Sequence, residues 1–204
     1  MKIENWQKCL DKNTGFEHLI KLTGLSLTKF QKTLTTELIN ERFLTIETIR
    51  QSGRLSSTAI AIIYYLLSEF DNSITLCSNK YVESVELINK VTDICDTLEI
   101  QYEVRKTPTL RIHFKETGNR IISHKKSKLP VVGYHVDWMI FQNMGRCSDN
   151  LLKHIHNHVF PMINASTKDK LLYIETVDSY NDTMSEILDS TNFKQIKIKR
   201  TFTT

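Results

Sequence analysis

Four short strand-like runs, three of them apolar, recur along this chain with helical segments between them. The runs are Ile46–Ile49, Ile74–Cys77, Trp138–Phe141 and Leu171–Ile174. Strands that are apolar on both faces are typical of parallel sheets, because the helices that connect parallel strands cover both sides. The sequence therefore predicts that these runs are neighbouring, mainly parallel strands of one sheet in an α/β fold.

The segments around these runs predict the remaining elements. Helices are expected over residues 3–12, 16–23, 26–40, 56–70, 82–98, 149–160 and 185–190. Ser26 has the side chain of an N-cap, and Pro161 is expected to end the helix before it. Residues 102–125 predict a hairpin that turns at 116–119. Residues 194–202 predict an alternating edge strand that exposes Lys197, Lys199 and Arg200.

The composition fits one globular domain. Of 204 residues, 40% are hydrophobic and 25% charged, and the net charge is +4, so the chain can bury a core and is not intrinsically disordered. The pI near 8.8 permits contact with nucleic acid without requiring it. Four cysteines without a CxxC pair fit a reducing compartment and suggest neither a zinc ribbon nor a disulfide framework. The N-terminus lacks the apolar core of a signal peptide, and the longest apolar run, Ala59–Leu67, is too short to span a bilayer.

The segment from Ile46 to Leu67 runs from a strand through a polar turn into an apolar helix, which is how phosphate-binding loops are built. Such a loop needs glycines, a lysine for the terminal phosphates and a hydroxyl for Mg²⁺. Gly53 stands where the last glycine belongs, but Thr48 takes the place of the first glycine. Arg54 replaces the lysine, and Leu55 replaces the hydroxyl. Taken alone, the segment also fits an ordinary strand-to-helix turn.

Four segments occur in one order with regular spacing: "LTKFQKTL", "ETIRQSGRLSSTAIAIIYYLL", "GYHVDWMIFQNMG" and "KLLYIETVDSYND". Together they resemble the ATPase domain of the large terminase, the DNA-packaging motor of tailed bacteriophages, over residues 25–190. The resemblance implies a RecA-like P-loop ATPase fold, with a mostly parallel central sheet flanked by helices. We therefore expect a single domain over residues 1–204, with a helical extension at 1–24 and without the family's nuclease domain. The resemblance also implies a virus-encoded protein in the host cytoplasm.

The resemblance assigns roles to residues near the loop. The family has an aromatic–Gln pair that contacts adenine, which Phe30 and Gln31 match, and its loop often reads R-Q-x-G-K-[ST]. Residues 50–55, "RQSGRL", keep four of these six positions, and the leading arginine is implied to act on the phosphates. The implied nucleotide-binding residues are Phe30, Gln31, Arg50, Gln51, Gly53, Arg54 and Ser56.

Departures from the family fall on the hydrolytic apparatus. Where the family strand ends in Asp-Glu, which hold Mg²⁺ and polarise the attacking water, this chain has Gln142 and Asn143. An Arg-Gly pair just upstream is replaced by Val132-Gly133, and Glu175-Thr176 only partly match a downstream coupling motif. Losses on separate segments argue against metal-dependent hydrolysis. An alternative alignment would make Asp137 the metal carboxylate.

These observations favour a terminase-like pseudo-ATPase, a non-hydrolysing accessory linked to viral DNA packaging. No cofactor or metal is expected, although adenine contacts leave room for weak ATP binding. The expected partners are other packaging proteins, an intact terminase or DNA. One alternative is an active motor in which Arg54, Ser56 or Asp137 substitutes for the lost groups. The other is a basic nucleic-acid-binding protein unrelated to packaging.

Two further clusters are ambiguous. His154 and His158 lie four residues apart on one helix face, as zinc ligands sometimes do, but no carboxylate or thiol nearby in sequence completes a site, which favours surface histidines. A basic cluster near the predicted hairpin fits either a solvated loop or a contact with a phosphate backbone or an acidic partner. Its members are Arg120, Lys125, Lys126 and Lys128.

Overall fold

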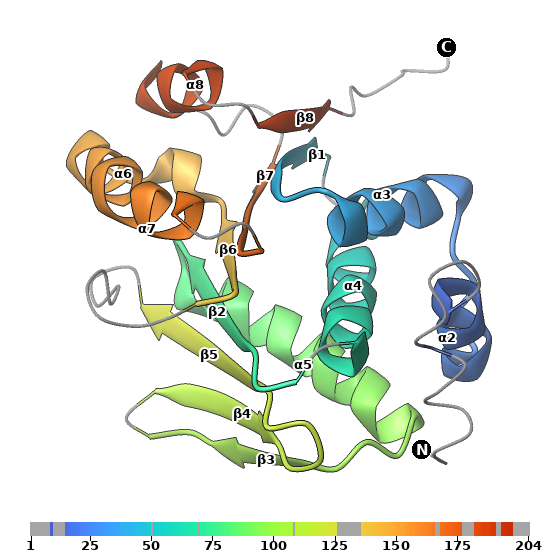
Figure 1. The fold of residues 1–204 in the computed structure, drawn as a ribbon. Helices are drawn as coiled ribbons and strands as arrows, with labels where there is room; N and C mark the ends of the chain where they lie inside the picture. The colour runs from blue at the N-terminus through green and yellow to red at the C-terminus, as the bar shows by residue number, and fades with distance from the viewer. Residues whose placement is uncertain are drawn as a thin grey trace. The chain divides into compact units, whose positions relative to one another are not determined.

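The computed structural model describes Cys9 and residues 15–49, 51–68, 70–107, 109–125, 136–165, 168–176, 182–190 and 193–197. Hydrogen bonds connect its strands into an eight-stranded sheet in the order β3-β4-β5-β2-β6-β7-β1-β8 (Figure 1). Contacts divide the chain into two compact units. The first unit holds the chain up to Asn40, Gly53–Asn72 and Val85–Ile122. The second unit holds Glu41–Ser52, Ser73–Ser84 and the chain from Ser123 onward.

Helices dominate the first unit. It contains α2 (Gly15–Thr23), α3 (Lys29–Asn40), α4 (Arg54–Ser68), most of α5 (Tyr81–Thr97), β3 (Tyr102–Arg105), β4 (Leu110–Phe114) and the start of β5 (Arg120–Lys125). The expected helices at 16–23, 56–70 and 82–98 are confirmed as α2, α4 and α5. The expected helix at 3–12 lies outside the described residues, Cys9 excepted.

Strands and short helices alternate in the second unit. It contains β1 (Phe43–Thr48), β2 (Ser73–Ser78), β6 (Trp138–Gln142), the 3-10 turn η2 (Met144–Arg146), α6 (Asp149–His154), the π-helix η3 (Ile155–Val159), α7 (Phe160–Asn164), β7 (Lys170–Thr176), α8 (Asp182–Asp189) and β8 (Lys194–Lys197). Within the described part of the expected C-terminal strand, β8 pairs with β1 at the sheet edge. Lys199 and Arg200 lie outside the described residues.

The four strand-like runs form neighbouring parallel strands, which confirms the central prediction from the sequence. β2 pairs with β6, β6 with β7, and β7 with β1, all in parallel. Ile140 faces Leu172 in the register of β6 and β7. Every residue of β2 and β6 is buried, as expected for strands that are covered on both faces. Because the strands are parallel, the carboxyl ends of β1, β2, β6 and β7 share one edge, where α/β proteins commonly bind ligands.

An apolar core in the second unit joins the sheet to α6, η3, α7 and α8. Phe141 of β6 stacks on Tyr173 of β7 with ring centroids 5.2 Å apart, and Phe193 lies 5.6 Å from Tyr173. The helices contribute Leu152, Ile155, Val159, Ile163, Met184, Ile187 and Leu188 to the same cluster. This packing fixes β6 and β7 side by side, and with them the residues at their carboxyl ends.

The helix expected at 149–160 does not end where the sequence predicts. The helical path continues through the π-helix η3 and α7 to Asn164, and Pro161 is the second residue of α7. In the π segment the N–H of Phe160 bonds the carbonyl of Ile155, five residues back. Pro161 has no N–H group to donate to the preceding turn, and that turn is the π segment η3, where the regular hydrogen bonding between residues four apart is already interrupted.

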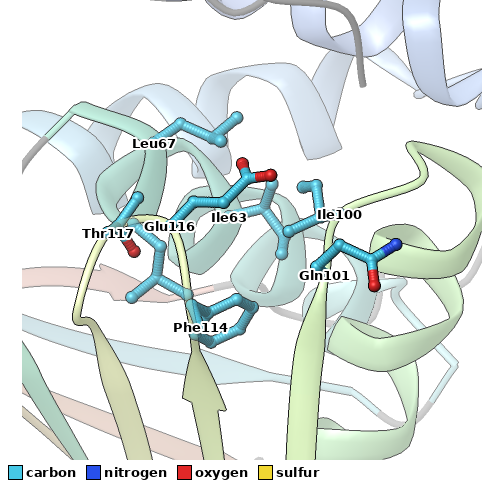
Figure 2. Close-up of a pocket in the computed structure, with 8 residues that line it drawn as sticks. Ile63, Leu67, Ile100, Gln101, Phe114, Glu116 and Thr117 are labelled. Atoms are coloured by element: carbon cyan, nitrogen blue, oxygen red, sulfur yellow. The ribbon is translucent and has the colours of Figure 1, made fainter.

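The hairpin of the first unit is anchored at its turn. The Asn119 side chain is fully buried; its Nδ2 donates to the Leu66 carbonyl at 2.6 Å, and its Oδ1 accepts the Asn72 N–H at 2.7 Å. The Asp71 N–H bonds the Thr117 carbonyl at 2.9 Å. Figure 2 shows the same turn beside α4, where Thr117 and Phe114 lie near Ile63 and Leu67 around a small apolar pocket. The hairpin expected at 102–125 is therefore confirmed and fixed to the end of α4.

All four cysteines are buried and none forms a disulfide, in agreement with the sequence. Among the helices that the structure describes, none is both long enough and apolar enough to cross a bilayer.

Candidate functional site

The loop between β1 and α4 contains two residues in the left-handed backbone region. Gln51 has φ 63° and is exposed, and Gly53 has φ 80°. A glutamine in this region is uncommon and strained, and such residues often cluster at functional sites. The N–H of Ser57 bonds the Gly53 carbonyl at 3.1 Å, which begins α4. Arg50, which the resemblance assigns to the phosphates, lies outside the described residues.

Thr28, and not Ser26, caps α3. The Gln31 N–H bonds Thr28 Oγ1 at 3.2 Å, and Gln31 Oε1 accepts the Thr28 N–H at 2.9 Å. This reciprocal pair is a capping box, which satisfies two N–H groups at the start of the helix. The expectation for Ser26 is wrong because only Thr28 has a glutamine three residues later.

The structure brings two predicted site residues together, Gln31 and Gly53. A Cβ atom placed on Gly53 would lie 1.9 Å from Gln31 Nε2, so that a side chain at this position would require the Gln31 side chain to move. The Gln31 carbonyl also accepts the Ser57 hydroxyl at 3.3 Å and the Thr35 hydroxyl at 2.8 Å. The carboxamide that the resemblance assigns to adenine is therefore held between its own helix cap and the loop glycine. Phe30, the other residue of the pair, is half-buried on α3.

Hydroxyl groups follow Leu55 in the first turns of α4. Ser57 donates to the Gln31 carbonyl, and Thr58 donates to the Arg54 carbonyl at 2.9 Å. Both hydroxyls therefore serve the helix and its contact with α3. Arg54, Leu55 and Ser56 are half-buried at the start of α4, which begins two residues earlier than the sequence predicts.

The carboxyl end of β6 carries the amide side chains of Gln142 and Asn143, which the resemblance assigns to the positions of the family's carboxylates. Gln142 is only 3% exposed, and its Oε1 has no hydrogen-bond partner among the described residues. Asn143 has φ 53°, its N–H bonds the Ile174 carbonyl at 2.8 Å, and its Nδ2 donates to Glu83 Oε1 at 2.9 Å. The position where a catalytic carboxylate is expected thus carries an amide donor that is engaged with a carboxylate.

Glu175 connects the end of β7 to the turn after β6. It is fully buried, and its Oε1 accepts the N–H groups of Met144 at 2.7 Å and Gly145 at 3.4 Å. Hydrogen bonds from main-chain N–H groups stabilise a buried carboxylate. Burial, and to a smaller extent the Glu175 charge, raise the pKa of Tyr173 on the same strand. The sequence placed Glu175 in a coupling-like segment, but it carried no signal for Glu83.

The alternative role for Asp137 is wrong. Asp137 precedes β6, at the edge opposite to Gln142, and its Oδ2 accepts the Ser73 N–H at 2.6 Å. The Asp137 N–H donates to the Ser73 carbonyl at 2.9 Å, and the Asp137 carbonyl accepts the Lys170 N–H at 2.7 Å. Asp137 therefore joins the starts of β2, β6 and β7.

The structure describes the histidine pair fully and the basic cluster near the hairpin only in part. His154 and His158 are both exposed, with ring centroids 4.6 Å apart, but no group of three possible metal ligands occurs within the described ranges. Arg120 is exposed at the start of β5. Lys125 ends that strand, and only its main chain is described; Lys126 and Lys128 lie outside the described residues.

No family profile matches the sequence, and a comparison with curated proteins found no match. Solved structures do match, 72 chains in all. The large terminase of a thermophilic bacteriophage is 11% identical with a TM-score of 0.61; the match covers 85% of this chain and 46% of that one. The bacteriophage HK97 large terminase is 14% identical with a TM-score of 0.64, over 86% and 40% of the two chains. The helicase MrfA, solved bound to DNA, is 9% identical with a TM-score of 0.67, over 94% and 30%.

This chain therefore spans less than half the length of these two large terminases. The ATPase domain of the Thermus phage P74-26 large terminase, solved alone, is covered to 67% with a TM-score of 0.58. At these identities the likeness establishes the fold. The chain has the RecA-like α/β fold of phage large-terminase ATPase domains, with a mostly parallel sheet.

Proposed function

We propose that this protein is a terminase-like pseudo-ATPase, a non-hydrolysing accessory in the packaging of viral DNA. The main support for this proposal is the chemistry at the end of β6. Gln142 and Asn143 have amide side chains there, and the Asn143 amide donates a hydrogen bond to Glu83. Mg²⁺ prefers anionic oxygen ligands, and an amide cannot accept a proton from water at neutral pH. Neither half of the usual Asp-Glu function can be performed by these side chains.

The loop supports the same proposal. Leu55 offers no oxygen to a metal, and the planar, forked guanidinium of Arg54 does not substitute simply for the compact charge of a lysine. The large terminase of the thermophilic bacteriophage has been solved in complex with ADP and with ATP-gamma-S, so a related fold accommodates nucleotide. Here Gln31 is held by Thr28 and packs against Gly53. We infer weak, metal-independent nucleotide binding, with Phe30 and Gln31 as the adenine contacts.

The proposed place of action is the host cytoplasm, where an accessory protein of this fold would act with an intact terminase or with other packaging proteins. Its role would be binding, through a surface that it shares with working motors, and not force generation.

A working motor is the second candidate function, and Glu83 is the observation that favours it. This carboxylate, 2.9 Å from Asn143 Nδ2, lies beside the position of the expected catalytic glutamate. If the protein hydrolyses ATP, we infer that Glu83 orients the attacking water in place of the catalytic glutamate. The two candidates therefore differ in whether the wild type hydrolyses ATP and in whether Glu83→Gln abolishes that hydrolysis.

The test is steady-state ATP hydrolysis with Mg²⁺, together with calorimetric titration of ATP and ADP with and without Mg²⁺. The proteins are the wild type, Glu83→Gln and Arg54→Ala. The pseudo-ATPase proposal expects no turnover above a no-protein control and an affinity that Mg²⁺ does not increase. Turnover that Glu83→Gln or Arg54→Ala abolishes would establish the motor instead.

A further inference from the structure

The small sheet of the first unit has two faces of opposite character. In β4, Leu110, Ile112 and Phe114 are buried, whereas Arg111 and His113 are exposed. At the start of β5, Ile121 is buried and Arg120 is exposed. Side chains alternate between the faces of a strand, so one face packs into the unit and the other carries cations to solvent.

The neighbouring strand adds to this charge. β3 lies beside β4 (Figure 1) and pairs with it in antiparallel register. Arg105 is opposite Arg111, and Glu103 is opposite His113. Directly opposite residues have Cβ atoms about 5 Å apart, and like charges there destabilise a sheet. The Arg105–Arg111 pair therefore opposes stability in the isolated protein.

No ion pair offsets this repulsion within the described residues. Glu103 is engaged by Lys115 through an ion pair of 2.8 Å, and that hydrogen bond and charge lower the pKa of Glu103 more than the charges of Arg105 and His113 do. Arg105, Arg111 and Arg120 form no ion pair with any acidic residue in the described ranges. A set of arginines without carboxylate ion pairs is suited to an external anion.

The face is also held in place. Asn119 fixes the turn to the Leu66 carbonyl and the Asn72 N–H, and the N–H of Arg120 bonds the Asn72 carbonyl at 2.9 Å. Gly118, with φ 72°, packs so closely against Asp71 that a Cβ atom would lie 2.1 Å from its carboxylate. A rigid backbone lowers the entropy lost when these arginines bind a ligand.

We propose that this basic hairpin face, defined by Arg105, Arg111, His113 and Arg120, binds the phosphate backbone of duplex nucleic acid. A guanidinium matches the geometry of phosphate oxygens through two parallel hydrogen bonds, and a row of phosphates would neutralise the Arg105–Arg111 pair. The inference goes beyond the proposed function and does not depend on whether ATP is bound or hydrolysed.

The face favours a duplex over a single strand. Proteins that bind single strands stack bases on exposed aromatic rings. The basic hairpin face carries no Phe, Tyr or Trp, and Tyr102 pairs with Phe114, whose side chain is on the buried face. Contacts to the phosphates alone carry no sequence information, so binding is independent of sequence and strongly dependent on salt.

The experiment measures fluorescence anisotropy of a labelled duplex of about 30 base pairs, at salt from about 50 to 200 mM. The test variant is Arg105→Gln/Arg111→Gln/Arg120→Gln. The matched control, Lys21→Gln/Lys32→Gln/Lys90→Gln, removes the same charge from exposed positions on α2, α3 and α5. The test variant is expected to lose affinity on the order of ten- to hundred-fold, and its salt slope should fall by about 2–3. The affinity of the control variant should fall only slightly, because its lower net charge weakens the general attraction to DNA.

Stability provides a second readout. Removing one of two opposed arginines relieves repulsion, so Arg111→Gln should melt at or above the wild-type temperature while it binds DNA less tightly. The proposal is overturned if the wild type does not bind the duplex, or if the two triple variants lose affinity equally. A single-stranded oligonucleotide or polyglutamate that competes as well as unlabelled duplex would also overturn it.

Discussion

Glu175 Oε1 accepts the main-chain N–H of Met144 at 2.7 Å, and both residues are fully buried. The contact joins the ends of β7 and β6 through a charge that has no access to water. Glu175→Ala would leave the Met144 N–H without its acceptor, so we expect the free energy of unfolding to fall by about 2–3 kcal/mol. Glu175→Gln retains an acceptor and should lose less. Chemical denaturation provides the measurement.

Glu186, which is exposed on α8, provides the control. Glu186→Ala should change stability by less than about 0.5 kcal/mol. Equal losses for Glu175→Ala and Glu186→Ala would show that the buried contact contributes little.

Gly53 has a positive φ and also packs against Gln31, and the contributions of these two features to stability can be measured separately. Gly53→Ala adds a Cβ at a positive φ and against Gln31, whereas Gly24→Ala adds one at φ 65° with nothing within 4 Å. The backbone penalty is about 1 kcal/mol at both sites, and the collision should destabilise Gly53→Ala by a further 1–2 kcal/mol, roughly. Comparing unfolding free energies of the two variants gives the steric part.

A double-mutant cycle identifies the colliding group. If Gln31 is that group, Gly53→Ala should destabilise the Gln31→Ala protein less than it destabilises the wild type. Additive effects would mean that Gln31 does not pack against the loop in solution.

Lys170 makes stability depend on alkaline pH. Burial lowers the pKa of Lys170 to about 8 from 10.5, and the Glu41 charge only partly offsets this. The folded protein therefore binds fewer protons than the unfolded chain between pH 8 and 10.5, so stability rises with pH through that window. Lys170→Met should stabilise the protein by about 1–3 kcal/mol at pH 7, and its advantage should shrink towards pH 10.5.

Lys168→Met, at an exposed position two residues earlier, should show no such pH-dependent difference. Wild type and variants are compared at each pH, because other groups titrate in the same range. An advantage of Lys170→Met that stays constant from pH 7 to 10.5 would refute the assignment to this amine.

Introducing the family's four hydrolytic groups tests whether these residues correspond to the family's nucleotide site. The revertant Arg54→Lys/Leu55→Thr/Gln142→Asp/Asn143→Glu supplies the lysine, the hydroxyl and both carboxylates. Single changes should do little, because residues that act as a unit are not additive. The revertant should bind a non-hydrolysable ATP analogue more tightly with Mg²⁺ than without it, as calorimetry would show.

The structure adds two conditions to that design. Asn143 is left-handed at φ 53°, where glutamate is strained by about 1–2 kcal/mol. Glutamate there would also face Glu83, so the revertant is best compared with a version that carries Glu83→Gln. A folded revertant without any metal-dependent gain, in either version, would show that these residues do not correspond to the family's site.

The sequence predicted the sheet better than the boundaries of its helices. Runs such as Trp138–Phe141 are apolar on both faces, which leaves few arrangements other than a central parallel strand. Helix boundaries depend on local competition: Ser26 and Thr28 both carry cap hydroxyls, and Gln31 decides between them. Pro161 does not end the helical path because a π turn precedes it, and a π turn leaves no periodic pattern in the sequence.

The sequence could predict those parts of the candidate site that lie at the ends of recognisable strands, but not the contacts between distant segments. Gln142 and Asn143 end a recognisable strand, and that strand's direction placed Asp137 at the wrong edge for a metal ligand. The contact between Asn143 and Glu83 joins residues 60 positions apart and leaves no periodic trace in the sequence. The resemblance assigns Gln31 and Gly53 to the site separately, but their close packing depends on tertiary structure.

The anchored turn of the hairpin also has a consequence for proteolysis. Loop tips rich in polar residues are normally the first places where a protease cuts, because the chain there can unfold locally into the enzyme's cleft. This turn instead has Asn119 buried beneath it and main-chain hydrogen bonds to Asp71 and Asn72. Trypsin should therefore spare the bonds after Lys115 and Arg120 during limited digestion, although both side chains are exposed.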